Sequence, residues 1–169
     1  MKKFLPLAIF IILLNIIALG THKIANQQAF AKNDYFPQFS LPHLLDENQT
    51  FNNQNIKQQY ALINFFASWC SSCRLEHDFL MELKNNPKIN LYGIAWRDID
   101  FDTQRFLKNL GNPYKIVATD SKNKLGKNLG VKGTPESFLI DKNGKIIFHY
   151  RGPLDDFEIN KIKRLISGS

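Results

Sequence analysis

The stretch that decides the fold is YALINFFASWCSSCRLEHDFLMELK, residues 60–84. Residues 60–67 are almost wholly apolar, which predicts a strand that is covered on both faces. Residues 71–84 are typical of a helix. The apolar residues of this helix recur at helical spacing at Leu75, Phe79, Leu80 and Leu83. Two cysteines, Cys70 and Cys73, therefore lie where a buried strand ends and a helix begins.

These two cysteines are the only ones in the chain, and they stand three positions apart. A disulfide between them closes almost no loop, so its value is chemical rather than stabilising. The unpaired N–H groups and the positive dipole end of the helix favour a thiolate at Cys70, which we expect to be the attacking nucleophile. Cys73 lies one turn deeper and is placed to resolve the mixed disulfide. We expect a redox-active Cys70–Cys73 disulfide, covered by Trp69.

Other uses of a Cys-x-x-Cys pair fit the sequence less well. Haem attachment requires His after the second Cys, but Arg74 follows Cys73. Structural zinc takes four ligands, and adding His77 to the cysteines gives at most three. A copper site of the Cys/His kind stays open as a non-enzymatic alternative. We expect His77 to be an exposed helix residue, and we expect neither a metal nor another cofactor.

The rest of the chain alternates strands and helices. Strands are expected at 89–96, 114–119, 137–140 and 145–150, and helices at 101–110, 121–129 and 155–166. The turn Asp141-Lys142-Asn143-Gly144 is typical of a hairpin. Alternation demands a parallel core, to which the late hairpin adds antiparallel strands. Upstream, residues 36–45 are expected to be extended and residues 46–49 to form a turn.

The N-terminus carries a membrane signal. Residues 4–20, FLPLAIFIILLNIIALG, would span about 25 Å as a helix, short for a bilayer crossing and long for a signal peptide. The cleavage-like motif Ala29-Phe30-Ala31 lies further beyond this run than is usual, which favours an uncleaved anchor. Lys2 and Lys3 outweigh Lys23, so the N-terminus stays cytoplasmic and the body faces the periplasm of a bacterium.

Charge argues against nucleic acid as a partner. The net charge is +7, of which residues 1–35 contribute +3 through four Lys and one Asp. The remaining Lys residues are scattered, and no basic run is interleaved with aromatic residues. A basic balance of this kind indicates a solvated surface rather than a nucleic-acid interface.

Several segments together resemble a known family. The strand–WCxxC–helix unit followed by GTPESFLID, residues 133–141, resembles the thioredoxin superfamily, an α/β fold with a central mixed sheet flanked by helices. The resemblance implies that Pro135 is cis and faces the cysteines. The closer resemblance is to the cytochrome c maturation thioredoxins of the DsbE/CcmG type, which also carry an N-terminal anchor. It rests on INFFASWC (63–70), CRLEH (73–77), LGNPY (110–114) and LGVKGTPESFLID (129–141).

Two positions, Ser71 and Asn64, differ from the residues found in related proteins. Ser71 stands where the family usually has Pro, so its redox potential does not carry over to this chain. Asn64 stands where thioredoxins proper have a buried Asp, and a neutral amide cannot take the proton of Cys73. The resemblance makes Glu76 and Glu136 the candidate acidic replacements, and Glu76 lies on the Cys73 side of the helix.

The resemblance implies a periplasmic dithiol reductase that keeps the CxxCH cysteines of apocytochrome c reduced, directly or through a haem-ligation thiol protein. Electrons would come from a membrane donor of the DsbD or CcdA kind. We expect a signal-anchor at residues 1–20, a tether at 21–35 and a thioredoxin-like domain at 36–169. Two alternatives stay open: a general membrane-anchored reductase of other exported proteins, and the metal-binding module.

Overall fold

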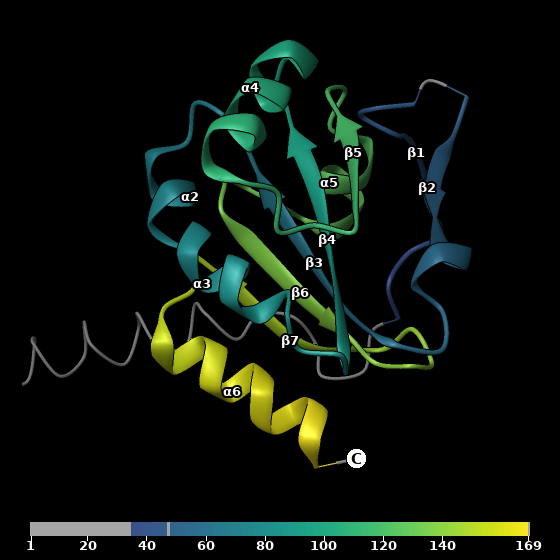
Figure 1. Cartoon of the computed structure of the whole chain (residues 1–169). Helices are drawn as coiled ribbons and strands as arrows, with labels where there is room; N and C mark the ends of the chain where they lie inside the picture. Colours follow the sequence, from purple (N-terminus) through teal and green to yellow (C-terminus); the bar gives the residue numbers. More distant parts are fainter. Residues whose placement is uncertain (1–34, 47, 169) are drawn as a thin grey trace, which may run out of the picture. The chain divides into compact units, whose positions relative to one another are not determined.

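The computed structural model describes residues 35–46 and 48–168, and its core is a five-stranded sheet in the order β5-β4-β3-β6-β7 (Figure 1). The strands are β3 (Tyr60–Phe66), β4 (Ile89–Trp96), β5 (Ile116–Asp120), β6 (Glu136–Ile140) and β7 (Ile146–Arg151). The helices are α2 (Ser71–Leu75), α3 (His77–Leu83), α4 (Asp100–Leu110), α5 (Lys124–Leu129) and α6 (Asp156–Ser167). The expected anchor and nearly all of the tether lie outside the described residues. Within the part of the chain that is described, no helix has the length and apolar character needed to cross a membrane.

The sheet has the mixed topology that the alternating pattern predicts. Strands β3, β4 and β5 are parallel, β6 pairs with β3 in antiparallel fashion, and β7 pairs with β6 in antiparallel fashion. All seven residues of β3 are buried, because this strand is central and both of its faces are covered. The predicted α/β thioredoxin fold, with a central mixed sheet flanked by helices, is confirmed.

Helices α3, α4 and α6 cover one face of the sheet, and the N-terminal segment covers the other, where α5 also packs against Trp96. On one face, which we call the cysteine face and which carries Asn64 and Ser137, Phe66 packs against Phe106 of α4 at 5.9 Å between ring centroids. Residues of α3 and α6 belong to the same hydrophobic cluster, and these helices lie together in Figure 1. On the far face Phe51 stacks on Tyr92 at 4.9 Å. The cysteine-bearing helix therefore lies on the face that α3, α4 and α6 cover with their apolar sides.

The helix expected over residues 71–84 is broken in two at Glu76. Helix α2 ends at Leu75 and α3 begins at His77, and the side chain of Glu76 turns into the protein with no exposed area. The buried face runs through Cys73, Glu76, His77, Leu80 and Leu83, so that Leu75 is 69% exposed and His77 only 3%. The interpretation of His77 as an exposed helix residue, and of Leu75 as part of the buried face, was therefore wrong.

A short sheet upstream of β3 has no clear counterpart in the sequence pattern. Strands β1 (Ser40–Pro42) and β2 (Thr50–Asn52) pair in antiparallel fashion, and a short 3-10 helix, η1 (Asn53–Ile56), follows directly. The extended segment expected over residues 36–45 contains β1, but β2 and η1 were not predicted. Three-residue strands are too short for periodicity to reveal them.

Candidate active site

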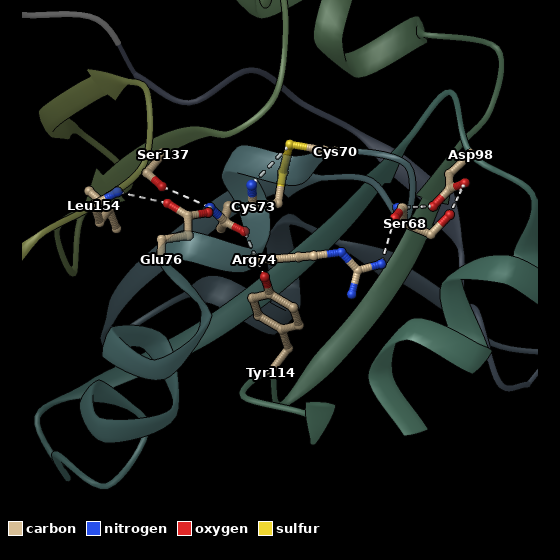
Figure 2. Close-up of a disulfide and its surroundings, with 10 residues drawn as sticks. Ser68, Cys70, Cys73, Arg74, Glu76, Asp98, Tyr114, Ser137 and Leu154 are labelled. Carbon is tan, nitrogen blue, oxygen red and sulfur yellow. Dashed lines mark hydrogen bonds between the residues drawn. A yellow bond between two sulfur atoms is a disulfide. The ribbon is translucent and has the colours of Figure 1, made fainter. Parts of the chain in front are cut away.

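The two cysteines form a disulfide at the start of α2 (Figure 2). Cys70 is the N-cap residue of the helix, with extended backbone angles, and its Sγ accepts the backbone N–H of Cys73 at 3.1 Å. Cys70 is 5% exposed and Cys73 2%. An N–H donor aimed at a sulfur stabilises negative charge on that sulfur, so this geometry favours a thiolate at Cys70 once the pair is reduced.

Asp98, just beyond the end of β4, holds the turn that leads into Cys70. One carboxylate oxygen accepts the backbone N–H of Ser68 at 2.6 Å and the hydroxyl of Thr103 at 2.8 Å. The other accepts the Ser68 hydroxyl at 2.8 Å and the N–H of Ile99 at 2.9 Å. Because four donors bind this one largely buried carboxylate, the turn before Cys70 is fixed to the end of the neighbouring parallel strand β4.

Trp69 lies on the surface beside this turn. It is 59% exposed, its indole N–H donates to the carbonyl of Arg97 at 3.4 Å, and its ring is 6.4 Å from that of Trp96. These contacts place Trp69 at the rim next to Cys70. That it covers the cysteine pair stays a prediction.

Glu76 occupies a buried pocket on the cysteine face. Its Oε1 accepts the amide N–H of Asn64 at 2.8 Å, and its Oε2 accepts the backbone N–H of Leu154 at 2.9 Å. The same Asn64 Nδ2 donates to the hydroxyl of Ser137 at 3.0 Å, and the Asn64 carbonyl accepts the hydroxyl of Tyr114 at 2.6 Å. The carboxylate is thus surrounded by neutral donors.

Burial without a charged partner changes the acidity of Glu76. Desolvation raises its pKa from 4.5 to about 7, and the hydrogen bonds from Leu154 and Asn64 only partly oppose this effect. Glu76 follows Cys73 by one turn of helix, and both side chains are buried. A carboxyl group with a pKa near neutrality, one turn from a buried thiol, can take and return a proton at physiological pH.

Glu136 lies on the far face of the sheet. Ser137 pairs with Asn64 and faces the Glu76 pocket, so Glu136, its neighbour along β6, points the other way. Its Oε1 is 2.6 Å from Nε2 of His149 and 3.1 Å from Nε of Arg151. The sequence offered Glu76 and Glu136 as alternatives for one role, and the structure separates them by the thickness of the sheet.

Pro135 precedes β6 and is buried, and the bond between Thr134 and Pro135 is cis. His77 is turned away from the cysteines: its Nε2 lies 3.2 Å from the carbonyl oxygens of both Leu110 and Gly111. Between residues 35 and 168, leaving out residue 47, no three His, Cys, Asp or Glu side chains are grouped as ligands for a metal.

Sequence reasoning missed three residues of this site. Tyr114 was predicted only as part of the LGNPY motif, with no role of its own, and no role was predicted for Asp98 or Ser137. Their contacts join positions 30 to 73 residues apart in the chain, so they depend on the packing of strands rather than on any local pattern. The only local sign was polarity, since an acid that directly follows a buried strand needs partners if it is buried.

The thioredoxin fold and a disulfide at the N-terminus of its first core helix define a thiol-disulfide oxidoreductase of the thioredoxin superfamily. The family model described as Redoxin matches residues 31–166, and the chain belongs to that family. It is a DsbE-type member: thiol:disulfide interchange protein DsbE of Allochromatium vinosum is 42% identical over 120 residues, covering 70% of this chain and 66% of that protein. The protein of the same name from Vibrio cholerae is 31% identical over 158 residues, covering 90% and 85%.

Solved structures share the fold. The crystal structure named as a thiol:disulfide interchange protein DsbE from Chlorobium tepidum superposes with a TM-score of 0.72 at 24% identity, covering 83% of this chain and 98% of that one. The solution structure named as a thioredoxin from Neisseria meningitidis has a TM-score of 0.69 at 26% identity, covering 79% and 89%.

Proposed function

We propose that the protein is a dithiol reductase on the periplasmic side of a bacterial inner membrane that reduces the CxxCH cysteines of apocytochrome c, directly or through a haem-ligation thiol protein. One observation carries the redox chemistry: Cys70 Sγ accepts the Cys73 N–H at the start of α2, with the Glu76 carboxyl group one turn further on. The resemblance to cytochrome c maturation thioredoxins supports the client, and the relatives named for thiol:disulfide interchange support the reaction.

The reaction begins from the reduced protein. The Cys70 thiolate attacks one sulfur of the client disulfide, and the other client sulfur leaves as a thiolate that takes a proton from water. Cys73 then loses its proton, attacks Cys70 Sγ and expels the second client sulfur. Two electrons have moved to the client, which becomes a dithiol, while Cys70 and Cys73 form the disulfide seen in the structure.

Glu76 serves as the proton acceptor for Cys73 in the second step. Its pKa of about 7 lets it be ionised often enough to accept a proton and protonated often enough to return one. Asn64 cannot do this, because an amide does not titrate, and its part is to donate to the carboxylate. A membrane thiol carrier of the DsbD or CcdA kind would then reduce the disulfide again.

The proposed direction of electron flow, from this protein to its client, is supported by the family resemblance and by Asn64 in place of a buried Asp. A reductant should have a redox potential nearer that of thioredoxin, about −270 mV, than that of DsbA, about −120 mV. Ser71 in place of Pro makes this a measurement to perform, by equilibration with glutathione. A potential near the upper value would reverse the proposed direction.

The client is tested by trapping. In a Cys73→Ala variant the mixed disulfide on Cys70 has no resolving thiol, so clients should accumulate as reductant-sensitive adducts. We expect adducts with apocytochrome CxxCH segments or with a haem-ligation protein, identified by mass spectrometry in cells that make c-type cytochromes. The matched control is the Cys70→Ala, Cys73→Ala double variant, which should trap nothing.

Each rival function predicts a different outcome of this experiment. Adducts only with unrelated exported proteins, together with normal levels of holocytochrome c, would indicate a general membrane-anchored reductase. No adducts, together with stoichiometric copper or zinc in the purified protein, would indicate a metal-binding module.

Membrane attachment is a separate proposal. Residues 4–20 would form an uncleaved anchor, because this apolar run is long for a signal peptide and the cleavage-like motif Ala29-Phe30-Ala31 is distant from it. N-terminal sequencing of protein from the membrane fraction tests this, and a mature start at Lys32 would show a cleaved signal peptide instead.

A further inference from the structure

Tyr114 enters the Glu76 pocket from outside the active-site helix. It lies just before β5, and its backbone N–H donates to the side chain of Asn112 at 2.9 Å. Its ring stacks on Phe66 at 5.0 Å between centroids and passes over Gly93. A Cβ at Gly93 would lie 2.7 Å from Cδ2 of Tyr114, so the glycine provides the space that lets the phenol reach the sheet.

The hydroxyl of Tyr114 contacts the carbonyl end of the Asn64 amide. It donates to the Asn64 carbonyl at 2.6 Å, which leaves the NH₂ group to donate to Glu76 at 2.8 Å and to Ser137 at 3.0 Å. Burial raises the pKa of Tyr114 well above its usual value of 10, so the phenol keeps its proton and remains a donor. In the reversed orientation the amide oxygen would face the Glu76 carboxylate, which is unfavourable while that carboxylate is ionised.

We propose that Tyr114 is a positioning residue for the exchange reaction: its hydroxyl holds the Asn64 amide with its NH₂ group toward Glu76, and so keeps that carboxylate ionised and ready to accept the proton of Cys73. This inference rests on the proposed function for its consequence in turnover. Its geometric part, the control of Glu76 by Tyr114 through Asn64, does not.

Few charged or titratable groups near Glu76 could shift its pKa in place of Tyr114 and Asn64. Tyr114 is the titratable side chain that interacts electrostatically with it, while Asn64 and Ser137 on the sheet are neutral and Cys73 is held in the disulfide. The charged or titratable residues on either side of Glu76 and of Leu154 make their contacts elsewhere. Arg74 donates to the Ser68 carbonyl, His77 lies against the Leu110 and Gly111 carbonyls, and Asp155 accepts the N–H of Phe157.

Loss of the hydroxyl has a directional effect. Tyr114→Phe removes the hydrogen bond that holds the Asn64 carbonyl away from Glu76, so the amide can rotate and present its oxygen to a protonated carboxyl group. That arrangement stabilises the neutral acid, and the pKa of Glu76 should rise. A rise of about 0.5 to 1 pH unit corresponds to the typical net contribution of one hydrogen bond.

The test is a carboxyl titration of the oxidised full chain, purified in detergent with ¹³C-labelled glutamate. A Glu76→Gln variant assigns the Glu76 signal by its disappearance. Tyr92→Phe is the matched control, because Tyr92 is also a buried tyrosine whose hydroxyl donates to a neutral oxygen, the backbone carbonyl of Asn55 at 2.7 Å on the far face. We expect the Glu76 midpoint to move upward in Tyr114→Phe and to stay in place in Tyr92→Phe.

The same variants are then reduced, and the pH dependence of dithiol exchange is measured. The inflection of the profile should move upward with the carboxyl midpoint in Tyr114→Phe, and adding Glu76→Gln to that variant should remove the shift. The inference would be overturned if Tyr114→Phe left the Glu76 midpoint unchanged, or if Tyr92→Phe moved it equally. Neither result would contradict the proposed exchange function. If the wild-type protein catalyses no exchange, the proposed function fails, and the titration still decides whether Tyr114 controls Glu76.

Discussion

Glu76 and Glu136 are both buried acidic side chains next to the central strand β3, but they lie on opposite faces of the sheet and have partners of different kinds. Glu76 accepts two hydrogen bonds, from the Asn64 amide and the Leu154 N–H, and its pKa rises to about 7. Glu136 lies against the guanidinium of Arg151 and the imidazole of His149. A neutral pocket leaves a carboxyl group able to change its charge, whereas a guanidinium partner makes it half of an ion pair. The Glu76 pocket therefore fits proton transfer, and the Glu136 cluster fits fastening of β6 to β7.

The largest expected effect is on the pH dependence of stability. Because folding raises the pKa of Glu76 from 4.5 to about 7, the folded protein retains a proton that the unfolded chain has lost between these pH values. The free energy of unfolding therefore falls as pH rises through this window and levels off above it. The contribution of this residue is about 3 kcal/mol, the equivalent of the difference between the two pKa values.

Urea unfolding of the oxidised full chain, followed by tryptophan fluorescence, measures this effect. Glu76→Gln lacks the titrating group, so it should gain about 3 kcal/mol relative to wild type between about pH 4 and about pH 8. The titration of every other group is the same in both proteins, so it cancels when the two free energies of unfolding are subtracted. A difference between the two proteins that is the same at every pH would mean that Glu76 titrates alike in the folded and unfolded chains.

A second variant tests the other half of the comparison. Glu136→Gln leaves Arg151 without its ion-pair partner in a mostly buried position, so we expect a loss of stability of about 2 kcal/mol. The inflection of the exchange profile should stay where it is in wild type, since Glu136 is across the sheet from Cys73. A shift of that inflection would place Glu136 in the proton path and remove the distinction between the two acids.

The sequence predicted the fold well because each of its signals is local. The apolar run of β3, the helix after the cysteines and the turn before β7 each depend on a few adjacent residues. The break at Glu76 was not predictable in this way, since LEHDFL continues a plausible helix. The partners of the buried Glu76 side chain, Asn64 and Leu154, lie 12 residues before and 78 after Glu76.

The site was predictable only in part for the same reason. The positions of Cys70 and Cys73 follow from one local strand–helix junction, and the family resemblance added Asn64, Glu76, Pro135 and Glu136. The face on which Glu136 lies depends on the register of β6 against β3, which the sequence does not state. A one-residue change of register would have exchanged the faces of Glu136 and Ser137.

The most direct test of the account is the rate at which Cys73 resolves a mixed disulfide between Cys70 and glutathione, measured against pH in wild type and in Glu76→Gln. Glu82→Gln is the control, because Glu82 is an exposed acid of α3 that pairs with Lys163 on the surface. If Glu76 accepts the Cys73 proton, the wild-type rate should rise through an inflection near its pKa of about 7. Glu76→Gln should lose that inflection and resolve about tenfold more slowly near neutral pH, equivalent to about 1.4 kcal/mol, while Glu82→Gln behaves as wild type. An unchanged profile in Glu76→Gln would contradict the account.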